Sequence, residues 1–181
     1  MVVFLVRNQL NKAKRIIIKL GTSTILKENG IFNYELINGF IKEIIKLKAQ
    51  GKEIVIVSSG AVGLGNNHLT WQKSEDKLLN KCSASIGQSK LMYSYQNSFD
   101  KFNLSIAQLL LTNKNFKTNR RKKRIKNVLE KLLEIGIIPI INENDSIITF
   151  EKWKQDPTKK QTSRYFNESA RVADFILEHL L

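Results

Sequence analysis

The stretch RIIIKLGTST, residues 15–24, decides the fold of this chain. Its three consecutive isoleucines predict a strand that is buried on both faces, as in a parallel sheet. Lys19 stands at the carboxyl end of this strand, and Gly21 then allows a tight turn with no Cβ in the way of a ligand. Backbone N–H groups, an ammonium and little bulk suit a phosphate site, although the same pattern suits an ordinary strand end.

A second apolar strand with its own glycine loop follows one helix later. Residues 34–47 carry apolar side chains at helical spacing, and residues 54–57 predict a buried strand that runs into Ser58-Ser59-Gly60-Ala61. A strand, helix, strand unit has parallel strands, so the loops at Gly21 and Gly60 should meet at the carboxyl edge of the sheet. Open α/β sheets bind ligands at that edge.

The remaining chain repeats this alternation. Residues 74–102 predict a helix and residues 104–112 a third strand, whereas residues 66–73 are interpreted as a loop. The basic stretch 119–126 leads into another helix, and a fourth buried strand over 137–141 ends in the polar loop Asn142-Glu143-Asn144-Asp145. The buried positions expected in the 74–102 helix are Leu78, Leu79, Cys82, Ala84, Ile86, Leu91 and Met92.

Composition narrows the class of protein. A length of 181 residues predicts one domain, and no apolar run reaches the roughly 18 residues of a membrane span. We find no signal-peptide pattern at the start. The single cysteine, Cys82, excludes an internal disulfide and favours the cytoplasm; on its helix we expect it to be buried or half-buried.

The net charge of +14 is compatible with a nucleic acid, a membrane surface or an anionic substrate as partner. Most of the excess is spread along helices, where charge is usually solvated. The exception is the run Arg120–Arg124. The alternative function from another class is a nucleic-acid-binding protein built on this run. Basic residues at a helix start usually lie in solvent, so we do not expect nucleic acid as a partner.

Three loops are therefore expected at one sheet edge: residues 19–23, 58–61 and 142–145. Together they offer a cation, amide donors, hydroxyl groups and a carboxylate. Such a set suits an anionic substrate beside a phosphoryl donor.

The sequence resembles glutamate 5-kinase (gamma-glutamyl kinase) of the amino acid kinase superfamily over residues 15 to about 149. The resemblance implies a three-layer α/β/α sandwich with a mainly parallel sheet. The Asn-Glu-Asn-Asp block favours glutamate over the aspartate, N-acetylglutamate, carbamate or UMP of related kinases. The blocks that carry the resemblance are Ile17–Ser23, Val57–Val62, Ile86–Met92, Ala107–Thr112 and Pro139–Asp145.

The resemblance implies phosphoryl transfer from ATP, with Mg²⁺ carried by the nucleotide, to the side-chain carboxylate of L-glutamate, the first step of proline biosynthesis. Lys19 would neutralise charge on the moving phosphoryl group, and Asp145 would hold the α-ammonium group. Phosphate binding would fall to Lys19, Gly21, Thr22 and Ser23, and substrate binding to Ser59, Gly60, Ala61, Asn142, Asn144 and Asp145.

Ordinary structural roles compete with three of these assignments. Asp145 also suits a solvated turn, and Ser59 also suits a helix N-cap. Asn142 and Asn144 suit loop-stabilising hydrogen bonds to the backbone as well as a pocket.

The chain departs from the family after about residue 149. Asp156 occupies the place of the first aspartate in the family's Gly-Asp-Asn-Asp motif and is the remaining catalytic candidate, but Pro157 replaces the asparagine. We expect residues 1–14 to be a lead-in, 15–149 the N-terminal, substrate-binding half, and 150–181 a divergent segment. The nucleotide-binding half and any RNA-binding-like domain are expected to be absent. We therefore expect the kinase activity to be impaired, or the chain to be an inactive remnant. A homo-oligomer or a separate chain that supplies the nucleotide-binding half would be the alternative.

Overall fold

The computed structural model describes residues 12–69 and 76–146 of the chain. Four strands form one parallel sheet in the order β1-β2-β4-β3. The strands are β1 (Arg15–Leu20), β2 (Glu53–Ser58), β3 (Ile106–Leu111) and β4 (Ile138–Glu143). The helices are α2 (Thr22–Ile25), α3 (Tyr34–Ala49), α4 (Ala61–Leu69), α5 (Lys77–Asp100) and α6 (Asn119–Glu134), with a 3₁₀ turn, η1 (Asn113–Phe116), before α6.

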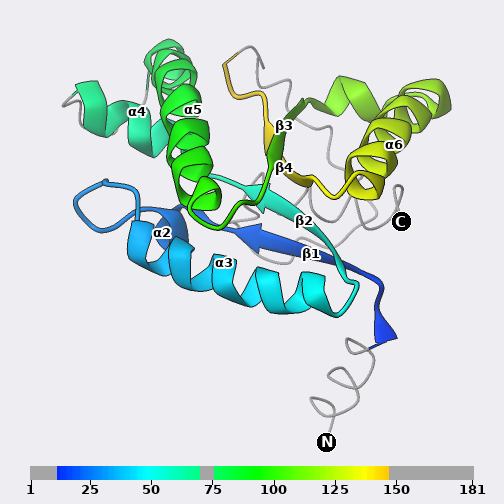
Figure 1. Ribbon diagram of the computed structural model, residues 1–181. Helices are drawn as coiled ribbons and strands as arrows, with labels where there is room; N and C mark the ends of the chain where they lie inside the picture. Colours follow the sequence, from blue (N-terminus) through cyan, green and yellow to red (C-terminus); the bar gives the residue numbers. More distant parts are fainter. Residues whose placement is uncertain (1–11, 70–75, 147–181) are drawn as a thin grey trace, which may run out of the picture.

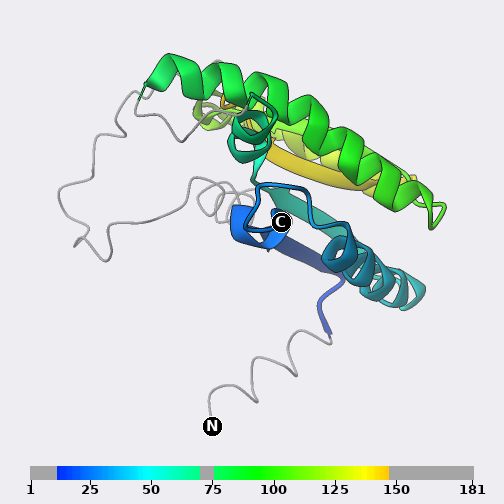
Figure 2. The same cartoon turned by 90° about the vertical axis from the view of Figure 1, so that its left-hand side faces the viewer.

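The helices cover both faces of this sheet, so the molecule has three layers (Figure 1). The side chains of β2 divide between the two faces of the sheet, because successive residues of a strand point to opposite faces. Ile54 and Ile56 pack with α3 and α5, whereas Val55 and Val57 pack with Leu129 of α6. Figure 2 shows α3 beside the β1–β2 part of the sheet and α5 beside β3 and β4. The predicted α/β/α sandwich with a parallel sheet is confirmed.

The core explains why the apolar runs form strands. The side chains of residues 54–57 in β2 are at most 1% exposed, as expected for a central strand with helices on both sides. The edge strand β1 is less buried, and Lys19 near its end is exposed. Arg15 joins β1 to α6 through two hydrogen bonds to the Glu130 carboxylate, both 2.9 Å long, and a third to Glu53 at 2.8 Å.

Several expectations about local structure are wrong. Helix α4 continues to Leu69, so residues 66–69 are helical rather than a loop. The basic run, by contrast, stands at a helix start as expected, because it forms the first turns of α6 after the N-cap Thr118. Cys82, Leu78 and Leu79 are exposed on α5, whereas three serines and two aromatic residues of this helix are buried. These buried side chains are Ser83, Ser94, Tyr95, Ser98 and Phe99.

No helix in residues 12–69 and 76–146 is both long enough and apolar enough to span a membrane. The expected segment 150–181, and Asp156 within it, lies outside the described residues, as do most of the expected lead-in and residues 147–149.

Candidate active site

The three predicted loops follow adjacent parallel strands, so they lie at one edge of the sheet. Strand β2 pairs with β1 on one side and with β4 on the other. A Cβ at Gly60 would lie 3.6 Å from Ile25, which follows the β1 loop, and one at Gly63 would lie 3.6 Å from Thr22. The loops after β1 and β2 are therefore in contact.

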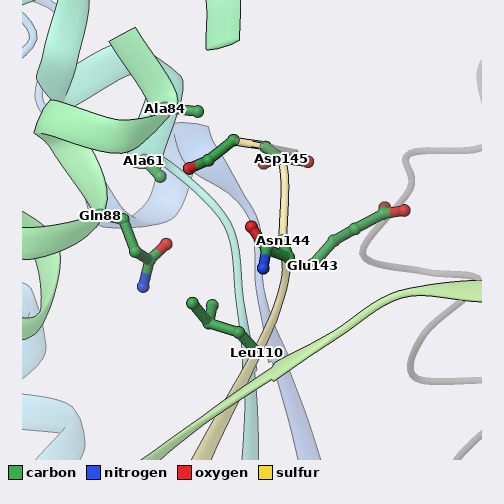
Figure 3. Close-up of a pocket in the computed structure, with 8 residues that line it drawn as sticks. Ala61, Ala84, Gln88, Leu110, Glu143, Asn144 and Asp145 are labelled. Carbon is green, nitrogen blue, oxygen red and sulfur yellow. The ribbon is translucent and has the colours of Figure 1, made fainter. Parts of the chain in front are cut away.

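The loop after β2 meets the loop after β4 in a small hollow (Figure 3). Ala61 contributes the β2 side, and Asn144 and Asp145 contribute the β4 side. Three of the predicted substrate residues therefore lie together. The complete lining is Ala61, Ala84, Gln88, Leu110, Glu143, Asn144, Asp145 and Ser146.

The phosphate-binding candidates occupy a different position. Lys19 and Ile17 are two residues apart in β1, and alternate residues of a strand lie on the same face of the sheet. Because Ile17 packs on the face that α6 covers, Lys19 lies on that face as well. Among the described residues, the Lys19 ammonium has no carboxylate within ion-pair distance. Gly21 is the N-cap of the short helix α2, and a Cβ there would meet no atom within 4 Å. Thr22 and Ser23 are exposed.

Gly60 has a backbone conformation that favours glycine, with φ at +100°. The first bond inside α4 runs from the Leu64 N–H to the Gly60 carbonyl, so Gly60 is the residue that caps this helix. The N-cap interpretation of Ser59 is therefore wrong. The hydroxyl group of Ser59 makes no hydrogen bond within the described parts of the chain.

Asn142 is buried in strand β4, not in a loop as predicted, because β4 continues to pair with β3 through Leu110 and Leu111. Its Oδ1 accepts a 2.9 Å hydrogen bond from the Glu143 N–H, and its Nδ2 donates to Gln88 Oε1 at 2.8 Å. Asn142 does not line the hollow; it ties the end of β4 to helix α5. Of the two predicted asparagines, Asn144 alone belongs to the lining.

Helix α5 lies against the start of α4 with backbone nearly touching backbone. A Cβ at Gly87 would collide with the Ala61 carbonyl oxygen, and a Cβ at Gly65 would collide with the Ser83 carbonyl oxygen. Glycine at both places allows this close approach. The contact brings Ala84 and Gln88 of α5 beside Ala61 at the hollow.

The basic run is at the start of α6, on the opposite face of the sheet from α5. Arg120, Arg121, Lys123 and Arg124 are exposed, as expected for a solvated helix end. Arg121 donates a 2.8 Å hydrogen bond to the Lys114 carbonyl.

A parallel α/β sheet with three loops at its carboxyl edge, a lysine and a carboxylate among them, is the framework of a ligand-binding enzyme domain. The chain belongs to the amino acid kinase family, whose model matches residues 14–152. It is 40% identical over 144 residues to a glutamate 5-kinase of Alkaliphilus metalliredigens, covering 79% of this chain and 54% of that protein. It is 41% identical over 142 residues to a glutamate 5-kinase of Clostridium perfringens, covering 78% and 53%.

A glutamate 5-kinase of Citrifermentans bemidjiense is 38% identical over 143 residues, which is 78% of this chain and 38% of the relative. The chain thus matches about half, or less, of the length of these curated relatives.

Proposed function

We propose that residues 15–149 form the amino-acid-binding part of a glutamate 5-kinase. The observation that carries the proposal is the hollow in which Asn144 and Asp145, from the Asn-Glu-Asn-Asp block, lie beside Ala61 at the start of α4. The family match and the relatives named glutamate 5-kinase give it independent support.

L-Glutamate is the proposed substrate because it carries one cation and two anions. The Asp145 carboxylate suits the α-ammonium group, since oppositely charged hydrogen-bonding groups pair strongly. The hydroxyl group of Ser59 and the backbone amides at Gly60 and Ala61 would hold carboxylate oxygens, with Asn144 shaping the wall between them. Asn142 would support substrate binding indirectly, because its hydrogen bonds fix the end of β4.

The proposed reaction is phosphoryl transfer to the side-chain carboxylate. A carboxylate oxygen bonds to the terminal phosphorus, the bond from phosphorus to the bridging oxygen breaks, and glutamyl 5-phosphate and ADP result. The attacking oxygen is already anionic at neutral pH, so no general base has to remove a proton. The protein's contribution is to position the substrate and to stabilise charge.

The residues at the end of β1 and directly after it fit a phosphate group. Lys19 is exposed and has no carboxylate partner within the described residues, and the space around Gly21 is open. MgATP would supply the phosphoryl group here, held by Lys19, Gly21, Thr22 and Ser23. We propose that the Mg²⁺ ion arrives on the nucleotide. Residues 12–69 and 76–146 contain no cluster of three His, Cys, Asp or Glu side chains that could hold a metal ion.

The proposal extends to proline biosynthesis in the cytoplasm, for which glutamyl 5-phosphate is the first intermediate. Asp156, outside the described residues, is the proposed organiser of the transferring group.

Calorimetric titration of the full chain with L-glutamate tests the proposal. L-Aspartate, which is one methylene shorter, is the control ligand. Preferential binding of L-glutamate supports the proposal, and trapping of an acyl phosphate by hydroxylamine in the presence of MgATP would extend it to the reaction. The absence of L-glutamate binding, with and without MgATP, would contradict it.

A further inference from the structure

Gln88 is the last residue in a series of hydrogen bonds that runs from Glu143 through Asn142. The backbone N–H group at the start of the series determines which atom donates at each step. The Glu143 N–H group can only donate, and it donates to Asn142 Oδ1 at 2.9 Å. Asn142 must therefore present its Nδ2 group to Gln88, which accepts through Oε1 at 2.8 Å. Reversing either amide would place two donors or two acceptors face to face. The Gln88 Nε2 group is thus left over as a hydrogen-bond donor.

This leftover donor is unusual because it is buried. Gln88 Nε2 is out of contact with solvent and has no acceptor within hydrogen-bond distance among the described residues. A buried donor without an acceptor is costly, and such groups in native proteins call for an explanation. A ligand that brings an acceptor would remove this cost.

The position of Gln88 indicates which ligand this is. Gln88 lines the hollow from α5, and Asn144 and Asp145 line it from the end of β4 (Figure 3). The residues that line the hollow therefore include a hydrogen-bond donor, the Gln88 amide, and a carboxylate, that of Asp145. An α-amino acid carries the complementary pair, a carboxylate and an ammonium group.

We propose that Gln88 is a substrate-binding residue whose Nε2 group donates a hydrogen bond to a carboxylate oxygen of the bound amino acid. This inference rests on the proposed function. It adds a substrate contact from α5, a helix in which neither the sequence nor the proposed function places a substrate-binding residue. The Asn142 bond holds the amide in the orientation that offers its hydrogens rather than its oxygen.

A purely structural role for Gln88, holding Asn142 in place, makes a different prediction for one substitution. Gln88→Glu keeps an oxygen that can accept from Asn142 Nδ2, but it replaces the donor with an anionic oxygen. A structural role predicts that this variant binds substrate normally. The proposed contact predicts at least about tenfold weaker binding, because a hydrogen bond to a charged group is lost and a repulsion gained.

The experiment is calorimetric titration of the full-length variants at pH 8 with L-glutamate, L-aspartate, glutarate and succinate. Gln88→Met removes the donor without adding charge, and it decides the matter if Gln88→Glu fails to fold. Gln108→Glu, at an exposed glutamine of β3, is the matched control for the charge change. Thermal unfolding confirms that each variant is folded.

Weaker L-glutamate binding by both Gln88 variants, with Gln108→Glu unchanged, supports the inference. L-Glutamate binding within twofold of the wild type in Gln88→Glu overturns the inference while the proposed function stands. If the wild type binds only another carboxylate of the panel, and the Gln88 variants weaken that binding, the contact is supported and the proposed function is not. If the wild type binds none of the four, with and without MgATP, both are overturned.

Discussion

The phenol oxygen of Tyr95 lies 3.0 Å from the hydroxyl oxygen of Ser58, directly before the loop that carries Ser59 and Gly60. Both side chains are completely buried. The Ser58 hydroxyl donates its proton to the Ser59 carbonyl at 3.1 Å, so Tyr95 must be the donor to Ser58. Burial raises the pKa of Tyr95 above its ordinary value of 10, which keeps this proton in place at neutral pH.

Tyr95→Phe should lower the free energy of unfolding by about 1 kcal/mol, the usual net value of one hydrogen bond. We expect weaker L-glutamate binding as well, because Ser58 would no longer be fixed behind the substrate loop. Urea denaturation and calorimetry measure the two effects. Tyr93→Phe, at a tyrosine of the same helix that is 67% exposed, is the control and should behave as the wild type. Equal stability of both variants would contradict the role of the Tyr95 hydroxyl.

Gly60→Ala should destabilise the protein by about 1 to 2 kcal/mol, because a side chain disfavours a positive φ. Gly39→Ala provides a control of opposite sign. Gly39 is an exposed glycine of α3 with no atom within 4 Å of an added Cβ, so alanine there should stabilise by roughly 0.5 to 1 kcal/mol. Chemical denaturation of the two variants measures the difference, and a stabilised Gly60→Ala would contradict the inferred strain.

Acidification should weaken the link between β1 and α6. The hydrogen bonds from Arg15 lower the pKa of Glu130 below its ordinary value of 4.5. Burial alone would raise the pKa of Glu53, but hydrogen bonds from Arg15 and Lys14 outweigh it, and that pKa is also lowered. A carboxyl group with a lower pKa in the folded state stabilises above its unfolded pKa. This contribution is lost as the pH falls from about 4.5 through the folded-state pKa.

Glu130→Gln should therefore flatten the acid side of the stability curve. At pH 7 the variant should be less stable than the wild type by up to about 1 kcal/mol, since Glu130 is partly exposed, and the difference should vanish below pH 3. Glu134→Gln, which removes an exposed pair with Lys131 on the same helix, is the control. Urea denaturation from pH 3 to pH 7 makes the comparison. A constant difference across this range would show that the Arg15 pair does not cause it.

Lys19→Met should separate transfer chemistry from folding. Lys19 is exposed and has no ion-pair partner within the described residues, so the variant should unfold as the wild type does. Loss of a cation at the moving phosphoryl group should slow transfer by about 100-fold or more. Hydroxamate formation measures the rate, and calorimetry should show unchanged L-glutamate affinity. Transfer at the wild-type rate would exclude Lys19 from the reaction.

The strands could be predicted from the sequence because their apolar runs leave few alternatives. Residues 54–57 are all apolar, and a short strand covered on both faces buries all four. The end of β4 cannot be predicted in the same way, because Asn142 and Glu143 are polar. They continue the strand because backbone pairing with Leu110 and Leu111 requires no apolar side chain.

Helix α5 shows where side-chain patterns fail. Its buried face includes Ser83, Ser94 and Ser98, which no hydrophobic period would place inside. Ser98 satisfies its hydroxyl group within the helix, donating to the Ser94 carbonyl at 3.0 Å, and so is tolerated in the core.

Site residues were predictable where they follow strands. Gln88 belongs to a block quoted for the family resemblance, yet a glutamine within a helix gives no signal of its role. Its partner Asn142 is 54 residues away in the sequence, and only the folded chain brings the two together.

The glycine contact between α4 and α5 has a consequence for movement. Gly65 and Gly87 let the two helices touch through their backbones, with no flexible side chains between them to accommodate sliding. The wall formed by Ala61, Ala84 and Gln88 is therefore a single rigid piece, whereas residues 143–146 extend from the tip of one strand. If the hollow closes around a ligand, the end of β4 would therefore move as a hinge, while helices α4 and α5 stay in place.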